Sequence, residues 1–330
     1  MRLSPVTIFF AIATAALIAA PLWTDAGGLR LLGEILCFMS LAVLWNLLAG
    51  YAGLVSVGQQ AFVGIGAYVL FSASIFLGIS PILAIPLAVA ASGIVALIFA
   101  PLLFRLEGAY FSIGTWVAAE TVLLIFSMIR PLGGGAGMSL PVAVVKGIAA
   151  SKTWREFTIY WLVLALGLAT LLGTYALLRS KAGLALMAMR DNSLAAASLG
   201  IDIWRAKLMT YVAVAAMTGG IGSVIFLQKL RISPSAAFNL NDWTVFVIFA
   251  VVIGGIGRLE GAIIGTLVYF LLRELLADYG SVYLIVLGSV AILTMLLSRN
   301  GIWGILERAK IAPLFATTRK PAAASARELT

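Results

Sequence analysis

Long apolar runs separated by short polar stretches dominate this sequence. A helix needs about 20 mostly apolar residues to cross the hydrocarbon core of a membrane. The pattern therefore predicts an all-α, polytopic integral membrane protein with about ten transmembrane helices. The predicted spans are Val6–Leu22, Leu31–Ala49, Gln59–Leu77, Ile82–Phe104, Ala109–Ile129, Thr158–Leu178, Leu208–Gln228, Trp243–Ile256, Gly261–Ala277 and Ser281–Leu297.

Glycine-rich stretches interrupt this pattern in two places. Trp243–Ile256 is short for a full crossing and ends in the glycines at 254–257, and residues 50–58 are glycine-rich and lead into Gln59. Irregular backbone at membrane depth is tolerated only where protein or a water-filled cavity surrounds it. We therefore expect broken helices or re-entrant turns at both places.

The first span has two interpretations. Arg2, the apolar run after it and the small pair Ala19-Ala20 resemble a secretory signal peptide. A retained first helix is the simpler interpretation for a chain with so many other spans, and both stay open at this point.

Composition supports the membrane assignment. The 330 residues are 62% hydrophobic and 11% charged, whereas a soluble domain has about 25% charged residues. The chain has no histidine and one cysteine, Cys37, so a disulfide within the chain, a histidine-ligated metal and histidine catalysis are all excluded. No P-loop motif is present. We expect a protein that is not an enzyme and holds no cofactor or metal.

Lysine and arginine predict the orientation. With ten spans and the amino terminus inside, 14 of the positive residues fall on the inner side and 8 on the outer side. Inner loops are enriched in positive charge. The count predicts that both termini are cytoplasmic.

A few polar residues fall within the predicted spans. Glu120 is the acidic residue nearest to the centre of a span, and Asn46, Gln59 and Gln60 lie in or beside apolar segments. Such residues either line a translocation path or bond neighbouring helices. For Glu120 the structural alternative is a hydrogen bond to Ser112, to Thr115 or to a helix outside this chain. The alternative class of transporter is an ion- or proton-coupled carrier. A single carboxylate of this kind gives that alternative little support.

The segment 179–207 is too polar to span a membrane and too rich in alanine for an unstructured loop. Asp191, Asn192 or Ser193 is a suitable cap for a short helix over Leu194–Leu199, and Gly200 is a natural stop. Such a helix fits a groove in a partner protein or rests on lipid, and its apolar stripe beside polar residues favours the partner. The candidate coupling residues are Arg190, Asp191, Asn192, Leu194, Ala195, Ala196, Ala197, Leu199, Gly200 and Ile201.

Glycines at regular spacing indicate close helix packing. Gly257, Gly261 and Gly265 recur every four residues, which places them on one helix face. Gly64 and Gly66 add packing or bending points along the predicted translocation path.

The order of several motifs resembles the branched-chain amino acid ABC permeases of the LivM type. The matching segments run through about residues 30–306. Glu260 and Ala262 depart from the expected apolar or aromatic residue and proline, and urea and short-amide permeases share the same motifs. The segments that carry the resemblance are residues 48–68, Gly108-Ala-Tyr-Phe111, Gly133–Met138, Arg190–Ile201, Gly254–Gly261 and Arg299–Gly304.

This resemblance implies an ABC importer permease fold and a set of partners. The implied partners are two ATP-binding cassette subunits, a second homologous permease subunit and a periplasmic substrate-binding protein. The second permease is either identical to this chain or different from it, and no nucleic acid is implied. Residues 1–306 would form the transmembrane domain in the bacterial inner membrane, 179–207 the cytoplasmic coupling segment, and 307–330 a disordered basic cytoplasmic tail. Branched-chain amino acids or small amides such as urea are the implied substrates, and the sequence does not choose between them.

Overall fold

The computed structural model describes residues 5–149, 151–276, 279–280, 282–298, 300–309 and 314–315. These residues are almost entirely helical, with one pair of short strands. The elements before residue 150 are α1 (Pro5–Ile18), α2 (Ala20–Trp23), α3 (Ala26–Asn46), η1 (Leu47–Tyr51), α4 (Gln59–Phe76), α5 (Pro81–Leu103), α6 (Ala109–Met128), η2 (Arg130–Leu132), η3 (Gly134–Ala136), β1 (Met138–Ser139) and α7 (Val142–Ile148). The later elements are α8 (Lys152–Arg179), α9 (Lys181–Asp191), α10 (Ser193–Ser198), α11 (Ile203–Lys229), β2 (Arg231–Ile232), α12 (Pro234–Ala237), η4 (Asn241–Val245), α13 (Phe246–Gly254), α14 (Leu259–Leu275), α15 (Val282–Leu297) and α16 (Gly301–Arg308).

Seven helical spans in the described residues are long and apolar enough to cross a membrane, or eight if the bent pair α15 and α16 counts as one. This confirms the polytopic all-α class with slightly fewer full-length spans than the ten expected. The difference lies in three short helices. α1 has 14 residues, α14 has 17 and α15 has 16. At 1.5 Å per residue, each is shorter than the roughly 30 Å hydrocarbon core.

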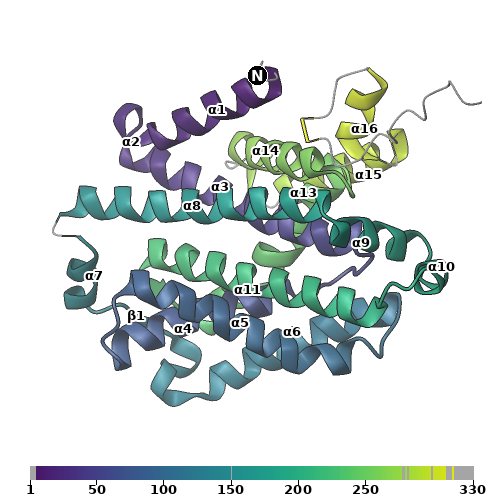
Figure 1. The fold of residues 1–330 in the computed structure, drawn as a ribbon. Helices are drawn as coiled ribbons and strands as arrows, with labels where there is room; N and C mark the ends of the chain where they lie inside the picture. Colours follow the sequence, from purple (N-terminus) through teal and green to yellow (C-terminus); the bar gives the residue numbers. More distant parts are fainter. Residues whose placement is uncertain are drawn as a thin grey trace, which may run out of the picture.

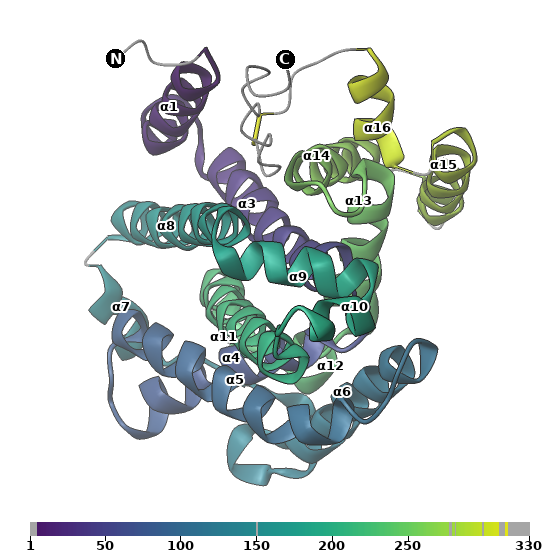
Figure 2. The same cartoon turned by 45° about the vertical axis from the view of Figure 1, so that its right-hand side comes forward.

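The helices are arranged around a buried centre made by α3, α4 and α11 (Figures 1 and 2). α5 and α6 cover one side of this centre, α8 lies along α3, and α13 and α14 pack on each other beside α3. The outer helices expose large apolar side chains, among them Leu83 and Ile98 of α5 and Leu124 of α6. Exposed apolar surface of this extent suits a lipid environment.

Small residues let the central helices approach closely. A Cβ atom at Gly66 of α4 would overlap the Gly219 carbonyl of α11, and one at Gly222 of α11 would overlap the backbone of Val63. The two backbones are therefore in direct contact, as at the small-residue interfaces common in membrane proteins. This contact fixes α4 and α11 as one unit.

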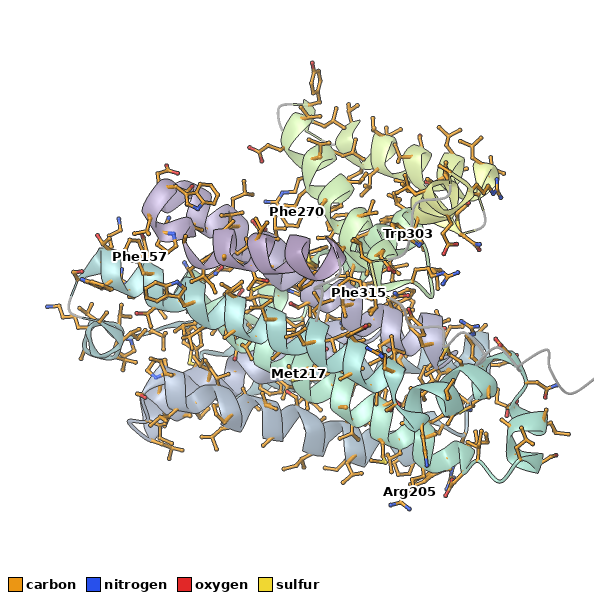
Figure 3. The ribbon with its side chains drawn as sticks, turned by 45° about the horizontal axis from the view of Figure 1, so that its top comes forward. Phe157, Arg205, Met217, Phe270, Trp303 and Phe315 are labelled. Atoms are coloured by element: carbon orange, nitrogen blue, oxygen red, sulfur yellow. The ribbon has the colours of Figure 1, made fainter. Side chains whose placement is uncertain are left out.

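The bundle has two distinct ends. α9 and α10 lie at one end and α7 with β1 at the other (Figure 1). Figure 3 marks the two ends by Phe157, near the start of α8, and Arg205, near the start of α11. At the α7 end, β1 pairs antiparallel with β2, with Met138 opposite Ile232. The glycine-rich loop after α6 is thereby tied to the end of α11.

The first helix is held by residues distant in sequence. Tyr160 of α8 donates its hydroxyl hydrogen to the Leu17 carbonyl at 2.8 Å. Phe10 of α1 meets the ring of Phe315 edge to face at 5.3 Å, and the Phe315 N–H donates to the buried carboxylate of Glu260 at 2.7 Å. Glu260 is one of the two residues that depart from the LivM-type motif. Its carboxylate thus holds the backbone at Phe315, near the carboxyl end of the chain.

The predicted boundary at residue 306 falls inside α16, which continues to Arg308. Residues 310–313 and 316–330 of the predicted basic tail lie outside the described residues, and the expected disorder stays a prediction.

Candidate functional site

The first helix interruption lies at the end of α3. Here the α-helix widens into the π-helix η1, and residues 52–58 continue as a loop before α4 begins. The loop is held by side chains on both sides. Trp45 donates its indole N–H to the Ser56 carbonyl at 2.8 Å, and Ser112 of α6 donates to the Val55 carbonyl at 2.6 Å. Thr115 accepts from the Val57 N–H at 2.9 Å.

The second interruption follows α13, where glycines turn the chain. Gly255 has φ 130° and Gly257 has φ 78°, conformations that glycine adopts without steric cost. α14 then begins at Leu259. Arg258, immediately before it, forms an ion pair of 3.0 Å with Glu307 of α16. Both places that the sequence predicted as breaks in transmembrane helices are therefore breaks in the structure.

Asn46 joins the two interruptions. Its side-chain amide donates to the Arg258 carbonyl at 2.8 Å, and its side-chain oxygen accepts from the Gly257 N–H at 2.8 Å. Asn46 is completely buried. One asparagine thus satisfies a donor and an acceptor in a loop that has no regular secondary structure, and it fixes the end of α3 against the start of α14.

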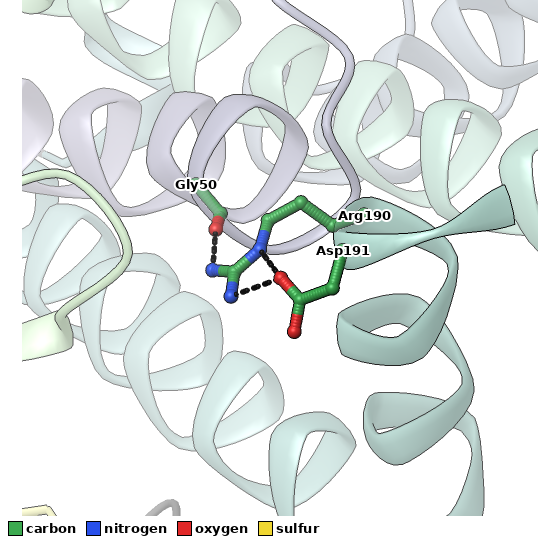
Figure 4. A network of polar contacts seen from close by, with 3 residues as sticks. All are labelled: Gly50, Arg190 and Asp191. Atoms are coloured by element: carbon green, nitrogen blue, oxygen red, sulfur yellow. Dashed lines mark hydrogen bonds and ion pairs between the residues drawn. The ribbon is translucent and has the colours of Figure 1, made fainter.

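Arg190, the penultimate residue of α9, reaches the same junction (Figure 4). Its guanidinium donates to the Gly50 carbonyl at 2.7 Å and forms an ion pair with Asp191 at 2.7 Å. The position that a side chain would take at Gly257 lies 3.4 Å from the same guanidinium. The segment predicted to contact a partner is therefore bonded to the first helix interruption and lies close to the second.

The helix α10 has the local structure predicted from its sequence. Asn192 caps it by accepting from the Ala195 N–H at 3.0 Å, and Gly200 takes the left-handed φ of 84° after it. Leu194 is 81% exposed and Leu199 is 80% exposed, whereas Ala196 is buried against the body of the protein. α10 and its C-cap therefore present two leucines outward from a fixed base, Leu194 within the helix and Leu199 immediately after it. The preceding helix α9 was not predicted.

Three more residues that were predicted to line the translocation path are buried in the protein: Gln59, Gln60 and Gly64. Gln59 donates to the Leu41 carbonyl at 3.1 Å, and Gln60 exchanges hydrogen bonds with Thr244 of η4. Gly64 faces the ring of Phe238, which leaves no room for a side chain there. Both glutamines are buried. Their role in translocation, like that of Asn46, Gly64 and Gly66, stays a prediction.

Glu120 has a partner that the sequence did not indicate. The carboxylate accepts from the indole N–H of Trp116, one turn earlier on α6, at 3.3 Å. The expected partners Ser112 and Thr115 hold the loop 52–58 instead. Neither Ser112 nor Thr115 is therefore the partner of Glu120, because these two hydroxyl groups bond backbone that only the folded chain brings near. A partner helix outside this chain stays a prediction.

The predicted glycine face holds for two of its three members. A side chain at Gly261 would overlap the Gly255 carbonyl, and one at Gly265 would overlap the Ala250 carbonyl, so both lie where α14 packs closely on the α13 segment. Gly257 was assigned to that face wrongly. It precedes α14 and serves the turn with its positive φ. A four-residue spacing does not reveal that the helix starts two residues later.

Comparison with known proteins assigns this architecture to a class. The family described as "Branched-chain amino acid transport system / permease component" matches residues 29–298. The chain is 26% identical to the high-affinity branched-chain amino acid transport permease LivM of Salmonella typhimurium, over 86% of this chain and 72% of that protein. It is 32% identical to a probable LivM of Methanocaldococcus jannaschii, over 60% of this chain and 56% of that protein.

A probable LivH permease of the same archaeon is also similar, at 26% identity over 75% of this chain and 82% of that protein. No solved structure matches the chain significantly. The chain is therefore similar both to permease proteins named LivM and to one named LivH.

Proposed function

Because this chain belongs to the family of permease components of branched-chain amino acid transport systems, we propose that it forms, with a second homologous permease, the path of branched-chain amino acids or related small amides. It is a permease subunit of an ABC importer and a multi-pass membrane protein. The names of its LivM relatives, which are branched-chain amino acid transport permeases, support the first of these substrate classes. In this proposal the chain is not an enzyme, two separate ATP-binding cassette subunits hydrolyse ATP, and a periplasmic binding protein delivers the substrate.

We place α9 and α10 on the cytoplasmic side of the inner membrane, together with both termini. When all ten predicted spans are counted as crossings, 14 positive residues fall on that side and 8 on the other, which supports the orientation. The ATPase subunits then meet the end of the bundle that carries Leu194 and Leu199.

The observation that carries the coupling proposal is the pair of exposed leucines at α10 and its C-cap, Leu194 and Leu199, whose base is tied to the helix interruptions. Arg190 contacts Gly50, and Asn46 connects this region with Gly257 and Arg258. A displacement of α10 is therefore transmitted to the ends of α3 and α13. ATP shifts the equilibrium between outward and inward states to the extent that the ATPase subunits bind one position of α10 more tightly.

Charged substitutions on α10 test this proposal. Burying one leucine is worth roughly 1.5–3 kcal/mol, so Leu194→Asp and Leu199→Asp should weaken ATPase binding by about tenfold or more. The matched control is Leu184→Asp, which alters an exposed leucine of α9 on the same side. The measurements are co-purification of the ATPase subunits and leucine-stimulated ATP hydrolysis in the reconstituted complex.

The alternative, in which α10 rests on lipid, gives a different result. In that case Leu194→Asp and Leu199→Asp would leave both ATPase co-purification and leucine-stimulated hydrolysis at the level of Leu184→Asp. That result would refute the coupling role of α10 and leave the assignment as a permease subunit intact.

A further inference from the structure

A cavity opens at the end of the bundle opposite α9 and α10, away from the junction described above. It has a volume of about 540 Å³, and its lining includes Glu34 and Phe38 of α3, Ile225 and Lys229 of α11, and Trp243 of η4. An adjoining cavity of about 250 Å³ shares Glu34, Phe38, Lys229 and Trp243 and adds residues of η4 and α14. Small-molecule sites commonly have volumes of about 300–1,000 Å³.

Five charged side chains line these two cavities. Arg30 forms an ion pair with Glu156 at 2.6 Å, and the other four fall into two pairs of different character. Glu34 and Arg273 bind each other through two hydrogen bonds of 2.8 and 3.0 Å, so their charges are satisfied. Within the part of the chain that the structure describes, neither Lys229 nor Asp242 has an ion-pair partner. One positive and one negative group are therefore available to a ligand in the same cavity.

The Lys229 ammonium is positioned by aromatic rings. It lies 4.9 Å from the ring centre of Trp243 and 5.3 Å from that of Phe226. These contacts hold a cation without neutralising its charge. An incoming carboxylate can therefore bind Lys229 without first displacing another anion.

Several apolar residues of the lining are held in place by their neighbours. Phe38 is buried and stacks on Tyr269 with 5.0 Å between the ring centres, and Trp243 donates its indole N–H to the Ala236 carbonyl at 2.7 Å. Ile225 adds an aliphatic surface to the larger cavity. Rings held in this way offer a preformed surface to a branched aliphatic side chain.

We propose that the two adjoining cavities together receive a zwitterionic α-amino acid with an apolar side chain. Lys229 binds its carboxylate, Asp242 binds its ammonium group, and Phe38, Ile225 and Trp243 contact its side chain. This inference rests on the proposed transport function and narrows its substrate, because urea and other neutral amides carry no charge for Lys229 or Asp242. A polar site built for such groups rejects a ligand that lacks them.

Uptake kinetics of the reconstituted complex with its ATPase subunits and binding protein test the two charges. For L-leucine, Lys229→Met and Asp242→Asn should each raise KM about tenfold or more, since a hydrogen bond to a charged group is worth at least one decade of affinity. Lys229→Arg should retain most of the affinity. The matched controls, Lys146→Met and Glu274→Gln, remove exposed charges that do not line the cavity and should leave KM unchanged.

A second measurement is independent of the binding protein. With Cys37 replaced by serine, Ile225→Cys places one thiol in the wall of the cavity. Saturating L-leucine should slow its reaction with a membrane-impermeant thiol reagent severalfold, and urea at the same concentration should not. Equal protection by leucine and urea, or protection by neither, would overturn the proposal.

The outcomes separate this inference from the proposed function. Leucine uptake by the unaltered complex together with unchanged KM values in Lys229→Met and Asp242→Asn would overturn the cavity assignment and leave the permease function standing. Uptake of urea in place of leucine would also overturn it. Absence of ATP-driven uptake of either compound by the unaltered complex would instead reject the proposed function.

Discussion

Asn46 should be a structural residue whose loss destabilises the protein before it affects any substrate. Its side chain makes two hydrogen bonds of 2.8 Å, to the Gly257 N–H and to the Arg258 carbonyl, in a completely buried position. Asn46→Ala removes both and leaves one donor and one acceptor of the loop unsatisfied. A buried unsatisfied polar group costs about 1–3 kcal/mol. We therefore expect the free energy of unfolding to fall by about 2–6 kcal/mol.

The assay is titration of the purified permease from a mild detergent into a denaturing one, followed by circular dichroism. Asn241→Ala, which alters an exposed asparagine of η4, is the control and should shift the transition little. Asn46→Asp should keep the bond to Gly257 but lose the one to Arg258 and bury a carboxylate facing that carbonyl oxygen, so it should also destabilise the protein. A loss below about 1 kcal/mol in Asn46→Ala, with transport abolished, would refute this reasoning and favour a role for Asn46 in the translocation path.

Three further predictions concern orientation, chemistry and packing. With Cys37 replaced by serine, Ser325→Cys should resist a membrane-impermeant thiol reagent applied to intact cells; ready labelling would contradict cytoplasmic termini. Glu120→Gln should keep more than about a tenth of leucine uptake, because a hydrogen bond to Trp116 is worth roughly 0.5–1.5 kcal/mol; complete loss at normal membrane levels would indicate a proton relay. Gly265→Leu should destabilise the protein by about 1–3 kcal/mol or more through overlap with Ala250, whereas Gly288→Leu, where the space is open, should melt like the unaltered protein.

The structural features that the sequence predicted are those that depend on residues close together along the chain. Apolar run length located the spans, and the glycines at 50–58 and 254–257 located both helix interruptions. The cap at Asn192 and the turn at Gly200 follow from side chain and backbone properties within α10. Each of these features needs only a few consecutive residues, so one sequence is enough to find it.

Contacts between distant segments were not predictable in the same way. Asn46 and Gly257 are 211 residues apart, and nothing in either local sequence pairs them. The cavity with Lys229 and Asp242 was missed for the same reason, since its lining comes from α3, α11, η4, α13 and α14, whose residues are spread widely along the sequence. α9 was missed because its lysine and arginine interrupt the apolar pattern, although Leu186 and Met189 are buried in the folded protein.

The contact between Phe10 and Phe315 has a consequence for how the chain is made. Ribosomes synthesise α1 first, but the ring that packs on it and on Tyr175 of α8 emerges about 300 residues later. Until Phe315 has been synthesised, the surface of α1 around Phe10 therefore lacks this aromatic contact. A chain released before residue 315 would also lack the Phe315 N–H, one of the hydrogen-bond donors to the buried Glu260 carboxylate. Because a buried acid is costly when it is less well satisfied, incomplete chains should be less stable than finished ones.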